Sequence, residues 1–239
     1  MSTTSTKQAF LEKAIAGLKK AHAVTESDDH RTVLEHLLYA VCREGVTTPE
    51  ADAAFDRLRK HFFDWNEVRV STVHEVEETL GKLPDAGEKA RALVGVLQQI
   101  FEQTFTFDLQ DLDKKGLKKA ATQLSRFKGV NDYALAWVIQ KALGGHAVPL
   151  DQPSMRVLGR LGVLDPTDNP EDVRGSVEHM VPKAKGTAFV ELVSQHARKM
   201  CTETAPSCHE CPLRKECPEG QERIRAEAAA TKATKAKPR

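Results

Sequence analysis

The segment CTETAPSCHECPLRKEC, residues 201 to 217, carries four cysteines separated by six, two and five other residues: Cys201, Cys208, Cys211 and Cys217. Four thiolates from one short loop can hold an iron-sulfur cube, in which each iron takes one cysteine, or a single tetrahedral zinc ion. Zinc sites usually combine two close pairs of ligands that lie far apart in sequence, whereas only Cys208 and Cys211 form such a pair here. Disulfides are the third alternative. The spacing therefore favours a 4Fe-4S cluster and leaves zinc and disulfides open.

The composition is that of an ordinary globular protein in a reducing compartment. Of the 239 residues, 40% are hydrophobic and 29% are charged. No stretch approaches the ~18 consecutive apolar residues of a membrane span, and the first residues do not form a secretory signal. Thiols stay reduced inside the cell, where the isolated Cys42 is expected to be a small buried residue. We expect a cytoplasmic monomer with a sizeable core and no membrane partner.

Apolar residues repeat at helical spacing through the first half of the chain. Amphipathic patterns cover residues 7–24 and 86–105, and VLEHLLYAVC, residues 33–42, is apolar enough for a helix buried on most sides. No useful stretch alternates with the period of two that marks strands, so we predict an all-α protein. The closing AEAAATKATKAKPR lacks the large apolar residues of a core. We therefore predict a basic disordered tail over residues 221–239.

The turn at Gly129 is a candidate phosphate-binding site. It lies between a helix predicted to end near Phe127 and the following helix YALAWVIQKALG. Glycine can adopt a left-handed conformation and has no side chain, so the N–H groups entering the second helix can approach a phosphate closely. Arg126 and Lys128 flank the turn and could contact neighbouring phosphates. Because most helix–glycine–helix turns only connect helices, the turn alone leaves DNA binding open.

Positive charge is local in this chain, since the formal net charge is only +1. Contacts with nucleic acid would have to come from patches such as the hairpin. A further basic patch is predicted around the cysteine loop, either as a phosphate contact or as a solvated rim: Arg198, Lys199, Arg214 and Lys215.

Asp151 precedes a predicted amphipathic helix that begins with Gln152 and Pro153. An aspartate at this position caps the helix by accepting bonds from its first N–H groups, with no catalysis required. The same carboxylate, kept ionised by the helix N-terminus, could also stabilise a developing cationic sugar or take a proton from an attacking water. Both roles stay open from the sequence.

The order of hairpin, aspartate and four-cysteine loop resembles the endonuclease III branch of the helix-hairpin-helix DNA glycosylase superfamily, over about residues 7–217. The resemblance implies that the four cysteines ligate a 4Fe-4S cluster and that Asp151 is the catalytic aspartate. It matches Gly129 and Val130 to the glycine-hydrophobic step of the hairpin. It also implies binding of double-stranded DNA in a groove between two helical lobes, with the target nucleotide flipped out of the duplex.

The resemblance implies two lobes, which are followed by the tail. Residues 32–145 would form a six-helix barrel that contains the hairpin. Residues 1–31 and 146–220 would together form the iron-sulfur lobe, and the predicted tail follows. DNA as the partner implies a cytoplasmic protein associated with the nucleoid.

Three positions depart from the family pattern. Tyr133 stands where members that also cut the strand carry a lysine, whose amine forms a Schiff base with the sugar. Asn131 replaces the second hairpin glycine and is followed by Asp132, which places negative charge near the phosphate site. The stretch from Tyr39 to Thr48 lacks the glutamine that often fills the gap left by the flipped base.

We therefore expect a monofunctional DNA glycosylase, in which Asp151 supports hydrolysis and Tyr133 replaces the lyase lysine. Some similar thymine-mismatch glycosylases carry tyrosine there and act by hydrolysis alone. The alternative is a non-catalytic iron-sulfur DNA-binding protein on the same fold, favoured by Tyr133, Asp132 and the missing glutamine. A redox-responsive structural protein is a third possibility.

Overall fold

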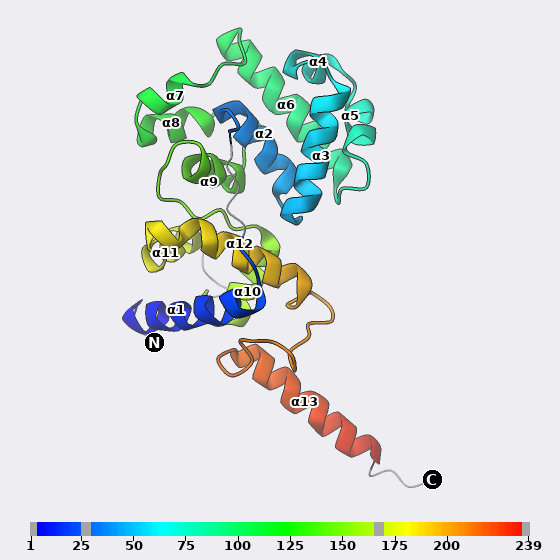
Figure 1. Cartoon of the computed structure of the whole chain (residues 1–239), viewed down its shortest axis with the longest axis vertical. Coiled ribbons are helices and arrows are strands. Elements are labelled where there is room, and N and C mark those ends of the chain that lie inside the picture. Colours follow the sequence, from blue (N-terminus) through cyan, green and yellow to red (C-terminus); the bar gives the residue numbers. More distant parts are fainter. Residues whose placement is uncertain (1–3, 25–29, 165–169, 236–239) are drawn as a thin grey trace. The chain divides into compact units, whose positions relative to one another are not determined.

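The computed structural model describes residues 4–24, 30–164 and 170–235. Thirteen helices form the regular structure of this described part, which contains no strand, and the prediction of an all-α protein is confirmed (Figure 1). The chain divides into two compact units, one of residues 27–149 and the other of residues 1–26 with 150–239. No helix among the described residues is long and apolar enough to span a membrane.

The unit of residues 27–149 is built from six helices of eight or more residues and two shorter ones. They are α2 (Val33–Arg43), α3 (Thr48–His61), α4 (Trp65–Val70), α5 (Val73–Leu80), α6 (Ala86–Thr104), α7 (Asp111–Lys114), α8 (Leu117–Leu124) and α9 (Asp132–Lys141).

Helix α2 is the centre of this unit. Every residue of α2 except Glu35 is buried, as its nearly continuous apolar sequence predicted, and Cys42 is fully enclosed. The helix begins with a capping box, in which the Thr32 side chain accepts a bond from the Glu35 amide and the Glu35 carboxylate accepts one from the Thr32 amide. The ring of Tyr39 packs edge-on against Phe55 of α3, with the ring centroids 5.5 Å apart. These contacts fix the start of α2 and hold the helix against α3.

The second unit combines the N-terminal helix with the C-terminal third of the chain. Its helices are α1 (Thr4–Ala21), α10 (Gln152–Arg160), α11 (Pro170–Met180), α12 (Lys183–Lys199) and α13 (Pro218–Lys235). Helix α1 approaches the cysteine loop so closely that a Cβ added at Gly17 would lie 2.9 Å from a methyl carbon of Leu213. The Lys7 ammonium donates to the Val163 carbonyl at 3.1 Å, which adds a polar contact to this packing.

The predicted disordered tail is wrong for most of its length. Helix α13 continues to Lys235, while residues 236–239 lie outside the described residues. The segment is rich in alanine, glutamate and arginine, which favour helix, and Glu219 pairs with Arg223 one turn later at 2.8 Å. A segment without large apolar residues cannot form a core, but it can still form a helix.

Candidate functional site

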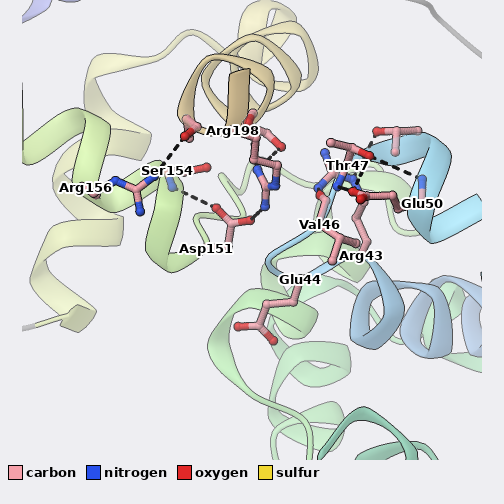
Figure 2. Close-up of polar contacts among 12 residues, drawn as sticks. Arg43, Glu44, Val46, Thr47, Glu50, Asp151, Ser154, Arg156 and Arg198 are labelled. Carbon is pink, nitrogen blue, oxygen red and sulfur yellow. Dashed lines mark hydrogen bonds and ion pairs between the residues drawn. The ribbon is translucent and has the colours of Figure 1, made fainter. Parts of the chain in front are cut away.

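Asp151 is a buried carboxylate at the start of α10. It is the N-cap residue, as the sequence predicted, and one carboxylate oxygen accepts a bond from the Ser154 amide at 3.0 Å. The other oxygen forms an ion pair and a short hydrogen bond with the Arg198 guanidinium, which comes from the last turn of α12 (Figure 2). Asp151 is only 3% exposed. A cap and a charged partner therefore fix both oxygens of this carboxylate.

The surroundings of Asp151 keep it ionised. Burial alone would raise its pKa, but the positive charge of Arg198 and the hydrogen bonds from Ser154 and Arg198 outweigh burial, and the pKa is lowered. A carboxylate with a lowered pKa is a weak base and a lasting negative charge. The geometry suits electrostatic stabilisation of a cation better than removal of a proton from water.

Arg198 was predicted as part of a basic rim around the cysteine loop, and the structure places it elsewhere. Its side chain is 12% exposed, and besides Asp151 it donates to the carbonyl and hydroxyl oxygens of Ser194 at 2.8 and 2.7 Å. Sequence reasoning missed this role because Asp151 and Arg198 are 47 residues apart and belong to different helices. No spacing pattern connects them.

The same helix α10 also holds the first part of the cysteine loop. Arg156 donates to the carbonyl oxygens of Ala197 and Cys201, both at 3.0 Å. Arg160, one turn later, donates to the Thr202 carbonyl at 2.7 Å and lies 3.4 Å from the Cys201 sulfur. One short helix thus carries Asp151 at its N-cap, Arg156 in its middle and Arg160 at its last residue.

The four cysteines of the loop line one pocket together with His196 and Gly220. All four are free thiols, so the disulfide alternative has no support among them. Their sulfurs face N–H donors: the Leu213 amide lies 3.4 Å from the Cys211 sulfur and the Gly220 amide 3.3 Å from the Cys217 sulfur. Such N–H donors around cysteine sulfurs are a feature of iron-sulfur sites.

Burial and mutual proximity both affect the ionisation of the cysteines in this pocket. Burial, with the charge of the neighbouring cysteines added, raises the pKa of Cys208 and Cys217, and that of Cys211 to about 11. A bound cluster would hold these sulfurs as thiolates and release their protons. A Cβ added at Gly220 would lie 3.4 Å from the Cys217 sulfur and 4.0 Å from the Cys208 sulfur, so the pocket is kept open there. Within the described ranges, no set of three or more His, Cys, Asp or Glu residues is arranged as a metal-ion site.

The predicted hairpin is present between α8 and α9. Gly129 has a φ of +97°, and a Cβ there would lie 3.1 Å from a methyl carbon of Val96, so the turn requires glycine for both conformation and space. Arg126 and Lys128 are exposed beside it, and Val130 is partly buried against the core. The Asn131 side chain caps α9 by accepting a bond from the Ala134 amide at 2.9 Å. The structure therefore joins α8 to α9 by a tight turn that depends on Gly129 and ends in the Asn131 cap.

The turn between α2 and α3 is bound to this hairpin by an acidic residue. The side-chain amide of Asn131 donates to the Glu44 carboxylate at 2.7 Å. Arg43 is fully buried and donates to the Val46 carbonyl and, at 3.2 Å, to the Thr48 hydroxyl (Figure 2). Sequence reasoning noted the missing glutamine in this stretch but did not find that Glu44 reaches the hairpin 87 residues later.

Tyr133 lies in the first turn of α9, after the hairpin. It is 6% exposed and belongs to the core, with its ring centroid 6.1 Å from that of Trp137. The residue is thus a packed side chain of the core.

Comparison of the sequence with known proteins finds DNA glycosylases, although no family model matches the chain. It is 25% identical over 206 residues to endonuclease III of Synechocystis sp., covering 85% of this chain and 90% of that protein. It is 34% identical over 101 residues to thymine-DNA glycosylase of Aeropyrum pernix, covering 40% and 45%. It also matches DNA glycosylase/AP lyase ROS1 of Arabidopsis thaliana at 26% identity, where it spans only 12% of the plant protein.

Solved structures give the same result for the fold. A non-covalent endonuclease III–DNA complex superposes with a TM-score of 0.73 at 20% identity, covering 94% of this chain and all of that one. A thermostable thymine-DNA glycosylase superposes with a TM-score of 0.64 at 17% identity, covering 92% and 100%. The chain therefore has the endonuclease III fold and is similar in sequence to DNA glycosylases of that type.

Proposed function

We propose that this protein is a monofunctional DNA glycosylase of base excision repair, which hydrolyses the N-glycosidic bond of a damaged or mismatched base. The observation that carries the proposal is Asp151, a buried carboxylate kept charged by Arg198 at the start of α10. The similarity to endonuclease III and thymine-DNA glycosylase supports the reaction class. The Gly129 hairpin supports DNA as the partner.

In this mechanism the C1′–N bond breaks with its electrons leaving on the base, and the sugar becomes an oxocarbenium-like cation. The Asp151 carboxylate stabilises that cation without having to lose a proton first. The oxygen of a water molecule then attacks C1′ and its proton passes to solvent. The nucleotide must be flipped out of the duplex, since the bond is not accessible in the base stack.

Tyr133 supports hydrolysis without strand cleavage. A lyase step needs an amine that attacks C1′ and forms a Schiff base, and a phenol cannot form one. Tyr133 instead packs on Trp137. We therefore propose that the abasic product leaves with an intact strand.

The proposed cofactor is a 4Fe-4S cluster held by Cys201, Cys208, Cys211 and Cys217. The shared pocket and the N–H donors around the sulfurs support a metal centre held by four thiolates, and the cysteine spacing favours the cluster over zinc. When bound, the cluster would supply a rigid cross-link for the loop and a redox centre. Arg156 and Arg160 hold the backbone of that loop from α10.

The partner in this proposal is double-stranded DNA, held at the hairpin by backbone N–H groups and by Arg126 and Lys128. Both side chains are exposed. Such contacts position a duplex without selecting its sequence. We expect the protein to act as a monomer at the nucleoid in the cytoplasm.

The test is a panel of duplexes that carry uracil, thymine mismatches, oxidised pyrimidines, oxidised guanine or alkylated purines, each incubated with cluster-loaded protein. Products are separated with and without alkali, which cleaves abasic sites. We expect alkali-dependent cleavage of at least one lesion, abolished by Asp151→Asn. Asn can still accept a bond at the N-cap position, so this variant removes the charge while it keeps the helix start.

The second candidate function is non-catalytic DNA binding. Glu44, bound to Asn131, and the exposed Asp132 place negative charge at the hairpin, which weakens a phosphate site. If this candidate is correct, no lesion is processed, and wild type and Asp151→Asn bind duplex DNA equally.

A further inference from the structure

Two buried histidines lie in line with one cysteine of the loop. The Nε2 atom of His22, at the end of α1, is 3.1 Å from the Nδ1 atom of His196 in α12. The Nε2 atom of His196 is 3.6 Å from the Cys211 sulfur. His22 is 8% exposed and His196 is 1% exposed. These two contacts connect the N-terminal helix, through α12, to a proposed cluster ligand.

The chemistry of a ligated cysteine decides which atom donates and which accepts in each of these contacts. A thiolate bound to iron carries no proton, so its sulfur can only accept, and His196 must donate from Nε2. The buried, largely apolar surroundings favour neutral rings over charged ones. In a neutral His196 with its proton on Nε2, the Nδ1 atom is an acceptor, so His22 donates to it from its own Nε2. One arrangement of protons satisfies both contacts.

Packing alone does not explain the pair. An aliphatic side chain would fill the position of His196 at lower cost, because a buried imidazole must find partners for both nitrogens. Both nitrogens of His196 have partners here, and one of them is a sulfur of the pocket. By contrast, His209, in the same loop, is 63% exposed and pairs with Glu227 on the surface at 2.8 Å.

We propose that His196, oriented by His22, donates a hydrogen bond to the Cys211 thiolate and thereby raises the reduction potential of the cluster and slows its loss. The inference rests on the proposed 4Fe-4S cofactor. A donor to a ligand sulfur stabilises the more negative, reduced cluster, and hydrogen bonds to the sulfurs are among the features that set cluster potentials. His22 is a positioning residue, since it acts on the sulfur only through His196.

The test compares cluster-loaded wild type with His196→Leu, His196→Gln and His22→Phe, and uses His209→Gln as the matched control on the exposed side of the loop. Iron and acid-labile sulfide are quantified first, and the midpoint potential of each protein is then measured without DNA. The rate at which the cluster absorbance decays under a mild oxidant is the second readout.

We expect His196→Leu to lower the reduction potential and to speed cluster loss. A tenfold change in the one-electron equilibrium constant corresponds to a shift of about 59 mV. His196→Gln, whose amide can still donate, should recover part of both effects. His22→Phe should shift the potential in the same direction by less, and His209→Gln should leave it unchanged.

Two results overturn the inference and are distinguishable. If wild type contains no iron and sulfide, the proposed cofactor is wrong and the inference falls with it. If the proteins are loaded and His196→Leu matches His209→Gln in potential and decay rate, the cofactor stands and the hydrogen bond has no role. Should His196→Leu fail to fold, His22→Phe makes the comparison, because His196→Gln keeps a donor, and a wild-type potential and decay rate in His22→Phe overturn the inference.

Discussion

At the scale of single residues, the proposed chemistry depends on a buried carboxylate that stays charged. Burial alone would raise the pKa of Asp151, and the positive charge of Arg198 helps to lower it instead. An ion pair of this kind fixes the role of the aspartate as well as its position. A permanently ionised group is suited to stabilising a cation, and no change of its protonation is needed during the reaction.

Removing the charge of Arg198 should make base excision dependent on pH. In Arg198→Met, burial acts on Asp151 without its counter-charge, so the pKa of Asp151 rises relative to wild type. Excision should then decline as the pH falls through this raised pKa, whereas wild type, with a lowered pKa, keeps its activity to about pH 4. The single-turnover excision rate across pH measures the difference.

The control for this experiment is Lys199→Met, which removes an exposed positive charge from the next residue. The Arg198 variant should also lose about 3–5 kcal/mol of folding free energy, because one partner of a buried pair is left alone. Identical pH profiles for the Arg198 and Lys199 variants would show that Arg198 does not control the ionisation of Asp151.

At the scale of elements, the hairpin between α8 and α9 depends on one glycine. Gly129→Ala forces a side chain into a positive φ and against Val96. We expect it to cost about 1–3 kcal/mol of stability and to weaken duplex binding. Thermal unfolding and binding titrations measure the two effects.

Gly95→Ala is the matched control, since Gly95 lies within α6 and a Cβ there meets no atom within 4 Å. It should stabilise the protein by up to about 1 kcal/mol through helix propensity and leave DNA binding unchanged. A Gly129→Ala protein that is as stable and binds DNA as well as this control would contradict the assigned turn.

The acidic residue after the hairpin cap should reduce DNA affinity. Asp132→Asn removes one negative charge in the first turn of α9, where a phosphate would bind. We expect affinity for a duplex to rise about two- to fivefold at low salt, with a smaller gain as salt increases. Binding titrations at several salt concentrations measure this, with Asp111→Asn, an exposed acid in α7, as the control. An equal gain in the control would place the effect in net charge rather than at the hairpin.

At the scale of the whole molecule, one unit is assembled from both ends of the sequence. Helix α1 packs with residues after 150 through His22, Lys7 and Gly17. The cysteine loop is held by α10 and contacts α12 and α13. A cross-link at this loop would stabilise helices that are far apart in sequence.

Removing the cluster should therefore loosen one unit and spare the other. After oxidative cluster loss, hydrogen exchange should speed up in α1, α10 and α12, while the amides of residues 27–149 keep their protection. Exchange measured by mass spectrometry on loaded and cluster-free protein checks this. Unchanged exchange in α1, α10 and α12 would mean that the loop does not stabilise the unit.

Local patterns in the sequence predicted the parts of the structure that depend on local physics. Helical periodicity predicted the all-α fold, and the position of Asp151 before Gln152 and Pro153 predicted its N-cap. The partners of these residues were not predictable, because Arg198 and His22 meet Asp151 and His196 through tertiary packing. For helix α13 the local signal was present but was not used. The segment lacks large apolar residues and was predicted to be disordered, although its residues favour helix.

The most direct test of the central claim is to follow base release and strand cleavage together on one duplex that carries a processed lesion, under single-turnover conditions. The account predicts that free base appears while the strand stays intact until alkali is added, and that Asp151→Asn abolishes release but still binds the duplex. Strand breaks that appear at the rate of base release, without alkali, would contradict the assignment of Tyr133. Base release that persists in Asp151→Asn would contradict the role of the carboxylate.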